Sequence, residues 1–158
     1  MKKEKKHILG VLFGISIISI YLLRMQQNCI NRWKQLSEKN RALFLLMDQW
    51  LRIKQDGKKI ESYFIKNNLR RIAIYGMSTV GMRLLKELKN SSVEVIYGID
   101  RNAENIYCEL KIVTVDEVLP EADVVIVTLV KGYDKICELL SGKVNCPVIA
   151  IEDIINEI

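Results

Sequence analysis

Short apolar runs alternate with amphipathic segments over the second half of the chain, and this alternation predicts an α/β fold. The runs are rich in β-branched residues, as strands buried in a sheet are, and they cover residues 71–75, 93–99, 111–113, 123–129 and 147–151. Segments with helical spacing lie between and after them, at residues 82–90, 114–119, 131–142 and 152–158. We therefore expect a five-stranded parallel sheet in the order 3-2-1-4-5, covered on both faces.

The expected helix at 114–119 rests on a capping signal rather than on length. Thr114 stands at the N-cap position and Glu117 at the third helical position, which together form a capping box. The pattern predicts a short helix directly after the third strand.

A different apolar pattern occupies residues 8–23, which run for 16 residues without a charge. A helix of that length rises roughly 24 Å against a hydrocarbon core of about 30 Å, so Lys6, Arg24 and the interfacial Tyr21 would have to extend it. No small-residue cleavage site follows the run. An uncleaved transmembrane anchor is therefore favoured over a signal peptide or a buried core helix.

Residues 30–55 predict a long amphipathic helix that ends at the Asp56-Gly57 turn. One face follows a spacing of three and four residues and comprises Trp33, Leu36, Asn40, Leu43, Phe44, Met47, Trp50, Leu51 and Lys54. Basic residues lie between these positions. The face is expected to pack on the following domain or on a second copy of the helix, with contact to an anionic membrane leaflet as a secondary role.

The chain is accordingly divided into a basic tail (1–7), a transmembrane anchor (8–23), a helical linker region (24–69) and an α/β domain (70–158). A second, short helix is expected at 58–65, within the linker region.

Charge is distributed unevenly along the chain. Residues 1–71 carry 16 Lys and Arg against 5 Asp and Glu, whereas residues 72–158 carry 8 against 14. The basic half indicates an anionic partner, and the neighbouring apolar segment favours membrane lipids over nucleic acid.

The side of the membrane is not decided by charge, because both flanks of residues 8–23 are basic to a similar degree. The four cysteines show no paired spacing, which agrees with a reducing compartment. Nucleotide ligands also belong to the cytoplasm, so the α/β domain is expected on the cytoplasmic side.

The segment GMSTVG, residues 76–81, stands between the first strand and the first helix of the domain. That order is the one a phosphate-binding turn requires. Gly76 suits the tight turn and Gly81 allows close packing of helix on strand, whereas Ser78 stands where a second glycine would let the backbone approach a pyrophosphate. The hydroxyl of Ser78 or of Thr79 would bond a phosphate or cap the helix.

Two further candidate residues end the second strand. Asp100 follows Gly76 by 24 residues, where a carboxylate binds ribose hydroxyl groups, and Arg101 beside it would accept a 2′-phosphate or pair with Asp100. The six positions predict a site for NAD(P) or a nucleotide sugar. In the alternative interpretation Gly76 and Gly81 serve packing alone and no ligand binds.

The run IAIYGMSTVGMRLLKELKNSSVEVIYGIDRNAENI, with the later VIVTLV and PVIAIEDII, resembles small Rossmann-type domains of bacterial surface-polysaccharide biosynthesis. Similar units form the N-terminal nucleotide-binding part of membrane-bound nucleotide-sugar dehydratases. The resemblance covers residues 70–158 and implies nucleotide-binding roles for Gly76, Ser78, Gly81 and Asp100, with Ser78 as a departure from the family pattern. It also implies a module that serves a polysaccharide-assembly enzyme, without the catalytic domain of the dehydratases.

Candidate catalytic groups are few. His7 is the only histidine, which argues against an imidazole base and a Cys/His zinc site. Tyr107 and Lys111 match the Y-x-x-x-K pair of short-chain dehydrogenases, but Lys111 opens a predicted strand, so coincidence is favoured. Cys137 is interpreted as a small core residue.

Three functions remain open from the sequence. The leading hypothesis is a membrane-anchored, non-catalytic module that binds a nucleotide, a dinucleotide or a nucleotide sugar. The alternative is a scaffold that self-associates or recruits partners through residues 30–55 and has an empty pocket. The third hypothesis is a reductase, and it is retained only because folds of this kind commonly bind redox cofactors.

Overall fold

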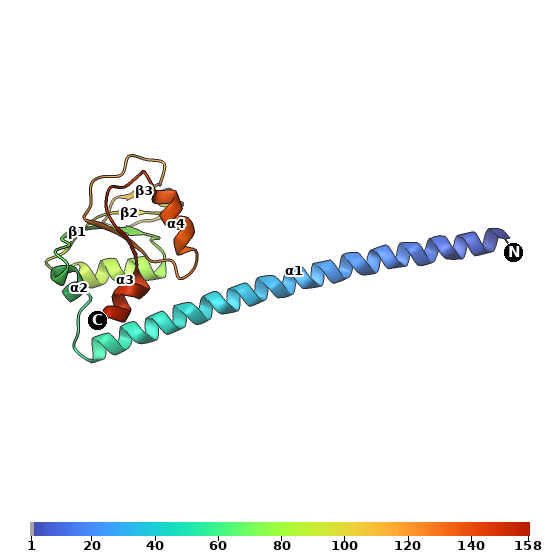
Figure 1. Ribbon diagram of the computed structural model, residues 1–158, viewed down its shortest axis with the longest axis horizontal. Coiled ribbons are helices and arrows are strands. Elements are labelled where there is room, and N and C mark those ends of the chain that lie inside the picture. Colours follow the sequence, from blue (N-terminus) through green and yellow to red (C-terminus); the bar gives the residue numbers. More distant parts are fainter. Residues whose placement is uncertain (1) are drawn as a thin grey trace. The chain divides into compact units, whose positions relative to one another are not determined.

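The computed structural model describes the backbone of residues 2–158 and the side chains of residues 18–158. The chain divides into a first unit that ends at Arg41 and a second unit, Ala42–Ile158. Helix α1 (Lys2–Gln55) contributes to both units (Figure 1).

The second unit contains a five-stranded, all-parallel sheet in the order β3-β2-β1-β4-β5, which confirms the predicted fold class and strand order. The strands are β1 (Arg71–Tyr75), β2 (Glu94–Ile99), β3 (Ile112–Val113), β4 (Val124–Val127) and β5 (Val148–Ala150). The other elements of this unit are α2 (Glu61–Lys66), α3 (Thr79–Leu88), the 3-10 helix η1 (Ala103–Asn105), α4 (Tyr133–Leu140) and α5 (Ile151–Glu157).

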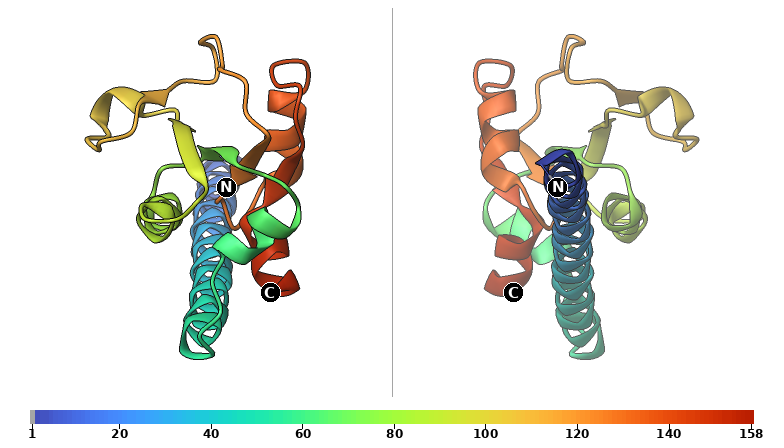
Figure 2. Two further views of the ribbon diagram at one scale, coloured as in Figure 1. Left: turned by 90° about the vertical axis from the view of Figure 1, so that its left-hand side faces the viewer. Right: turned by 90° about the vertical axis from the view of Figure 1, so that its right-hand side faces the viewer.

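Each face of the sheet has its own apolar core, because successive strand residues point to opposite faces. On one face Ile72 and Ile74 of β1 pack with α2, α3, α5 and the end of α1. On the other face Ala73 and Tyr75 pack with α4 and with the segment that precedes β4. Figure 2 shows α3 and α4 on these opposite sides. Burial on both faces explains why the central strands are almost continuously apolar.

The compact unit is longer than the range 70–158 expected from the sequence. Leu46, Trp50 and Ile53 of α1 are buried in the first core together with Ile60 and Phe64. The last turns of α1 thus complete the cover of the sheet, so the helix packs on the domain that follows it. The predicted apolar face is nevertheless buried only in part, because Phe44 and Leu51 are 67% and 56% exposed, whereas Leu46 and Ile53, outside that face, are buried.

Helix α1 ends at Gln55, where the sequence predicts an end. Gly57 in the turn that follows has a φ of 73°, in the left-handed region that favours glycine. The predicted anchor, residues 8–23, lies for the most part outside the described side chains. Within the part whose side chains are described, no helix combines the length and the apolar character needed to cross a membrane.

The predicted helix at 114–119 is wrong, since this segment forms a turn. The capping contact itself is present: Thr114 donates to Glu117 Oε1 from its backbone N–H, at 2.7 Å, and from its hydroxyl, at 3.2 Å. Pro120 offers no N–H to continue a helix and disfavours the helical conformation of the residue before it. The capping contact therefore closes a single turn, and Pro120 prevents a helix from continuing beyond it.

Replacing Leu46 by Ala is expected to destabilise the protein by about 2–5 kcal/mol, because it opens a cavity in the first core. Its neighbour Leu45 is 52% exposed, against 5% for Leu46, so Leu45→Ala should change stability by less than about 0.5 kcal/mol. Denaturant unfolding of the two variants measures the difference. Equal stabilities would show that α1 is no part of the folded unit.

Candidate functional site

The loop between β1 and α3 lies at the carboxyl edge of the sheet, where the strand order reverses between β1 and β4. Gly76 opens this loop with a φ of 92°, a backbone conformation that favours glycine. Its N–H donates to the carbonyl oxygen of Ile99 at 2.8 Å, which ties the loop to the end of β2. The tight turn predicted at Gly76 is therefore present.

Gly81 brings α3 directly against this loop. A Cβ atom at Gly81 would lie 2.2 Å from the carbonyl oxygen of Gly76, a distance that no side chain tolerates. The close packing predicted for Gly81 is thus made between helix and loop backbone. As a result, the first turn of α3 starts at the switch point of the sheet.

Thr128 holds the same loop from the β4 side and was not singled out in the sequence. Its buried hydroxyl donates to the carbonyl oxygen of Gly76 at 2.5 Å and lies 3.0 Å from that of Tyr75. The sequence signal that could have found Thr128 is its place as a polar residue near the end of the apolar run DVVIVTL. A buried hydroxyl at that position needs a partner, and the neighbouring strand end supplies it.

Asp100 joins the end of β2 to the loop through its carboxylate. Oδ2 accepts the backbone N–H of Met77 at 2.8 Å, and Oδ1 accepts that of Asn102 at 2.9 Å. A carboxylate has about four lone-pair positions, so two further acceptor positions remain. The side chain that the sequence assigns to a ribose is therefore fixed in place beside the glycine turn.

Ser78 and Thr79 are exposed at the start of α3. Ser78 is the N-cap residue with extended backbone, and its side chain makes no capping hydrogen bond. The first N–H groups of a helix have no partner within the helix and carry partial positive charge, so they suit an anion. Arg101 is also exposed and follows Asp100 at the same edge.

Two tyrosines stand near this edge. Burial raises the pKa of Tyr75, with Asp100 adding to the rise and Arg101 opposing it. Burial, followed by contact with the Cys137 thiol, raises the pKa of Tyr133 to about 12. Both phenols therefore remain protonated at neutral pH, and neither supplies a general base.

The remaining candidate groups do not assemble into a reactive site. Tyr107 is 92% exposed on the segment before β3, and Lys111 directly precedes that strand, so the pair does not share a helix face. Cys29, Cys108, Cys137 and Cys146 are free thiols. Among residues 18–158 no three His, Cys, Asp or Glu side chains come together in a way that would hold a metal ion.

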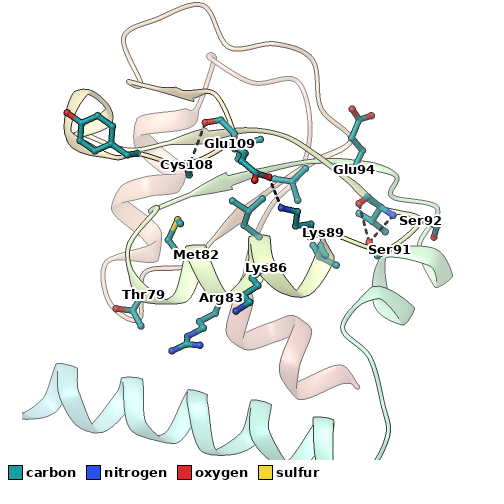
Figure 3. A pocket seen from close by; sticks show the side chains of 16 residues that line it. Thr79, Met82, Arg83, Lys86, Lys89, Ser91, Ser92, Glu94, Cys108 and Glu109 are labelled. Carbon is teal, nitrogen blue, oxygen red and sulfur yellow. Dashed lines mark hydrogen bonds and ion pairs between the residues drawn. The ribbon is translucent and has the colours of Figure 1, made fainter.

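A large groove lies beside the predicted site rather than over it. It has a volume of about 970 Å³ and is formed by α3, the first half of β2 and the segment before β3 (Figure 3). Of the six predicted site residues only Thr79 lines it. The predicted residues thus gather at the carboxyl edge, while this groove follows the flank of α3.

The fold and the edge that it forms define a Rossmann-like α/β protein. Comparisons with protein-family models, with curated proteins and with solved structures found no match to this chain.

Asp100→Asn should destabilise the protein by about 1 kcal/mol or more, because the amide group would face one of the two N–H donors that the carboxylate now accepts. Glu104→Gln, on the neighbouring η1, removes the same charge from an exposed position and serves as the control. Denaturant unfolding measures both variants. Equal stabilities would mean that the Asp100 bridge does not hold the loop.

Proposed function

We propose that this protein is a membrane-anchored accessory module that binds a nucleotide, a dinucleotide such as NAD(P), or a nucleotide sugar through its phosphate groups. The observation that carries the proposal is the start of α3, whose N-cap side chain leaves the first-turn N–H groups uncapped next to Gly76. The fixed carboxylate of Asp100 at the adjacent strand end supplies a second contact of the same kind of site.

In this arrangement the phosphates accept hydrogen bonds from the first turn of α3. The Cβ atom of Ser78 keeps the backbone further from the ligand than glycine would, and the hydroxyl groups of Ser78 and Thr79 compensate by donating to phosphate oxygens. The free lone pairs of Asp100 accept from a ribose hydroxyl group. Arg101 stands beside Asp100 to contact a further phosphate.

The module is proposed to bind rather than to transform its ligand. The carboxyl edge offers donors and the carboxylate of Asp100, whose two oxygens already accept backbone N–H groups, and both nearby tyrosines stay protonated, so acid–base chemistry is not favoured. The resemblance to polysaccharide biosynthesis domains supports a role beside a polysaccharide-assembly enzyme.

The anchor is proposed to be residues 8–23, with the α/β unit on the cytoplasmic side. Ile20, Leu22 and Leu23, in the described part of this segment, expose large apolar side chains, as residues that face lipid do. Arg32, Lys34, Lys39 and Arg41 further along α1 would contact anionic headgroups.

Titration of the full-length protein with NAD(H), NADP(H) and UDP-sugars tests ligand binding. Ser78→Glu places a carboxylate at the phosphate position and should weaken binding at least about tenfold by charge repulsion. Ser141→Glu, at the exposed C-cap of α4, adds the same charge far from the loop and should leave affinity unchanged. Absence of any dissociation constant below about 1 mM would refute the proposal.

A scaffold that self-associates through α1 is the second candidate, and one stripe of that helix favours it. Cys29, Trp33, Leu36 and Asn40 recur at spacings of four, three and four residues, and Trp33 and Leu36 are 67% and 47% exposed. This is the spacing of a coiled-coil interface, in which one polar Asn pairs with its own copy and fixes the register.

In a parallel pair of such helices, Cys29 faces Cys29 of the second copy. Mild oxidation of the full-length protein should then yield a covalent dimer that Cys29→Ser abolishes. Leu36→Glu should reduce dimer formation strongly, whereas Gln35→Glu, next to it but off the stripe, should not. A monomer in analytical ultracentrifugation, together with no cross-link, would exclude this candidate.

A further inference from the structure

The groove along α3 extends from the start of this helix to the segment after its end. Thr79 lies at one end and Ser91 and Ser92 at the other, as Figure 3 shows. Leu85 of α3 and Val95 of β2 line the groove and are only partly buried against the first core. The groove is therefore apolar inside and as long as the helix that borders it.

The groove exists because the connection between β2 and β3 lacks a full helix. Parallel strands are usually joined by a right-handed crossover that carries a helix, and this helix would lie beside α3 on the same face of the sheet. In this protein the connection contains only the three-residue η1 (Figure 2). Because β3 pairs with β2 only at Gly98 and Ile99, the first half of β2 has no strand beside it at this edge.

The charges around the groove are asymmetric. Arg83 and Lys86 are exposed on α3 and line the groove, and no ion pair of either is present among the described side chains. Lys89, one turn further on, is paired with Glu109 at 2.7 Å. The side formed by α3 thus carries two basic groups without an acidic partner. The opposite wall carries Glu94, and Glu109, which is paired with Lys89.

We propose that the groove binds an amphipathic helix of a partner protein, which takes the place of the missing crossover helix. Its apolar residues would cover Leu85 and Val95, and acidic residues on one flank would face Arg83 and Lys86. A helix of about ten residues, the length of α3, would match the groove in length once the Lys89–Glu109 ion pair, which joins its two walls, has opened.

Charge distinguishes a partner helix from the two other possible occupants of the groove, a second copy of this chain and an anionic lipid. A second copy of this chain offers the exposed surface of α1, whose residues Arg32, Lys34, Lys39 and Arg41 would meet Arg83 and Lys86 with like charge. An anionic lipid would be repelled by Glu94 on the opposite wall, where Glu109 is already paired with Lys89. A partner helix can present an acidic flank to α3 and a neutral or basic flank to β2.

The test uses the full-length protein and two synthetic helical peptides with the same apolar stripe, one flanked by Glu and the other by Lys. Fluorescence anisotropy should show at least about tenfold tighter binding of the Glu peptide. Lys86→Glu should weaken that binding about fivefold, and Lys135→Glu, which makes the same exchange at an exposed position on α4, should not change it.

Met82→Asp tests the contribution of the apolar lining of the groove, to which Met82 belongs. Because Met82 is 37% exposed, the fold tolerates a polar group at this position. This variant should lose binding of the Glu peptide while its circular dichroism spectrum and unfolding midpoint stay close to those of the parent. Equal binding of the two peptides, no binding of either, or no effect of Lys86→Glu would overturn the proposal. It would equally be overturned if Lys86→Glu dissolved an oligomer or released the protein from anionic vesicles, since the groove would then bind a second copy or lipid.

Discussion

The approach of α3 to the loop at Gly76 is the contact on which the arrangement of this protein depends. With 2.2 Å between the Gly76 oxygen and the place of a Cβ atom on Gly81, helix and loop touch through backbone alone. That approach sets the start of α3 at the end of β1. The loop is fixed from two sides, by Thr128 directly after β4 and by Asp100 directly after β2, so the ends of three neighbouring strands determine one turn. The loop is thereby held in place, so the proposed anion site would need no rearrangement to bind its ligand.

Three surfaces of the protein carry the proposals: the carboxyl edge with Ser78, the groove along α3, and the stripe of α1 around Trp33. They differ in physical character. The edge offers backbone N–H groups and one carboxylate, the groove offers apolar side chains beside basic ones, and the stripe offers large apolar groups with a single amide. Each surface is therefore proposed to take a different occupant, namely a small anionic ligand, an acidic helix or a second copy of the chain. Such a set of proposed contacts would suit a module that connects other molecules.

The sheet could be predicted because its strands are buried on both faces. Short β-branched apolar runs such as DVVIVTL are typical of such buried strands. Gly76 and Gly81 were recognisable because each position excludes a side chain. The end of α1 at Gln55 was marked by Asp56-Gly57. The predicted helix at 114–119 failed because a capping box describes only the first turn, whereas Pro120 ends the segment before a second turn forms. The contribution of Leu46 to the core was missed because the apolar residues of α1 extend over more than one face, and periodicity does not state which face the domain will cover.

The sequence by itself determined the parallel sheet, the order of its strands and the glycine turn, since these follow from local patterns of burial and backbone conformation. The tertiary structure alone decided that α1 enters the core from Ala42 onward, that Thr128 holds the loop, and that a groove opens along α3. The physical reason is that a periodic pattern indicates which side chains are buried but not which element buries them. That element depends on the length and path of the connecting segments. The connection between β2 and β3 contains only the three-residue η1, and the groove along α3 lies where a crossover helix would otherwise pack.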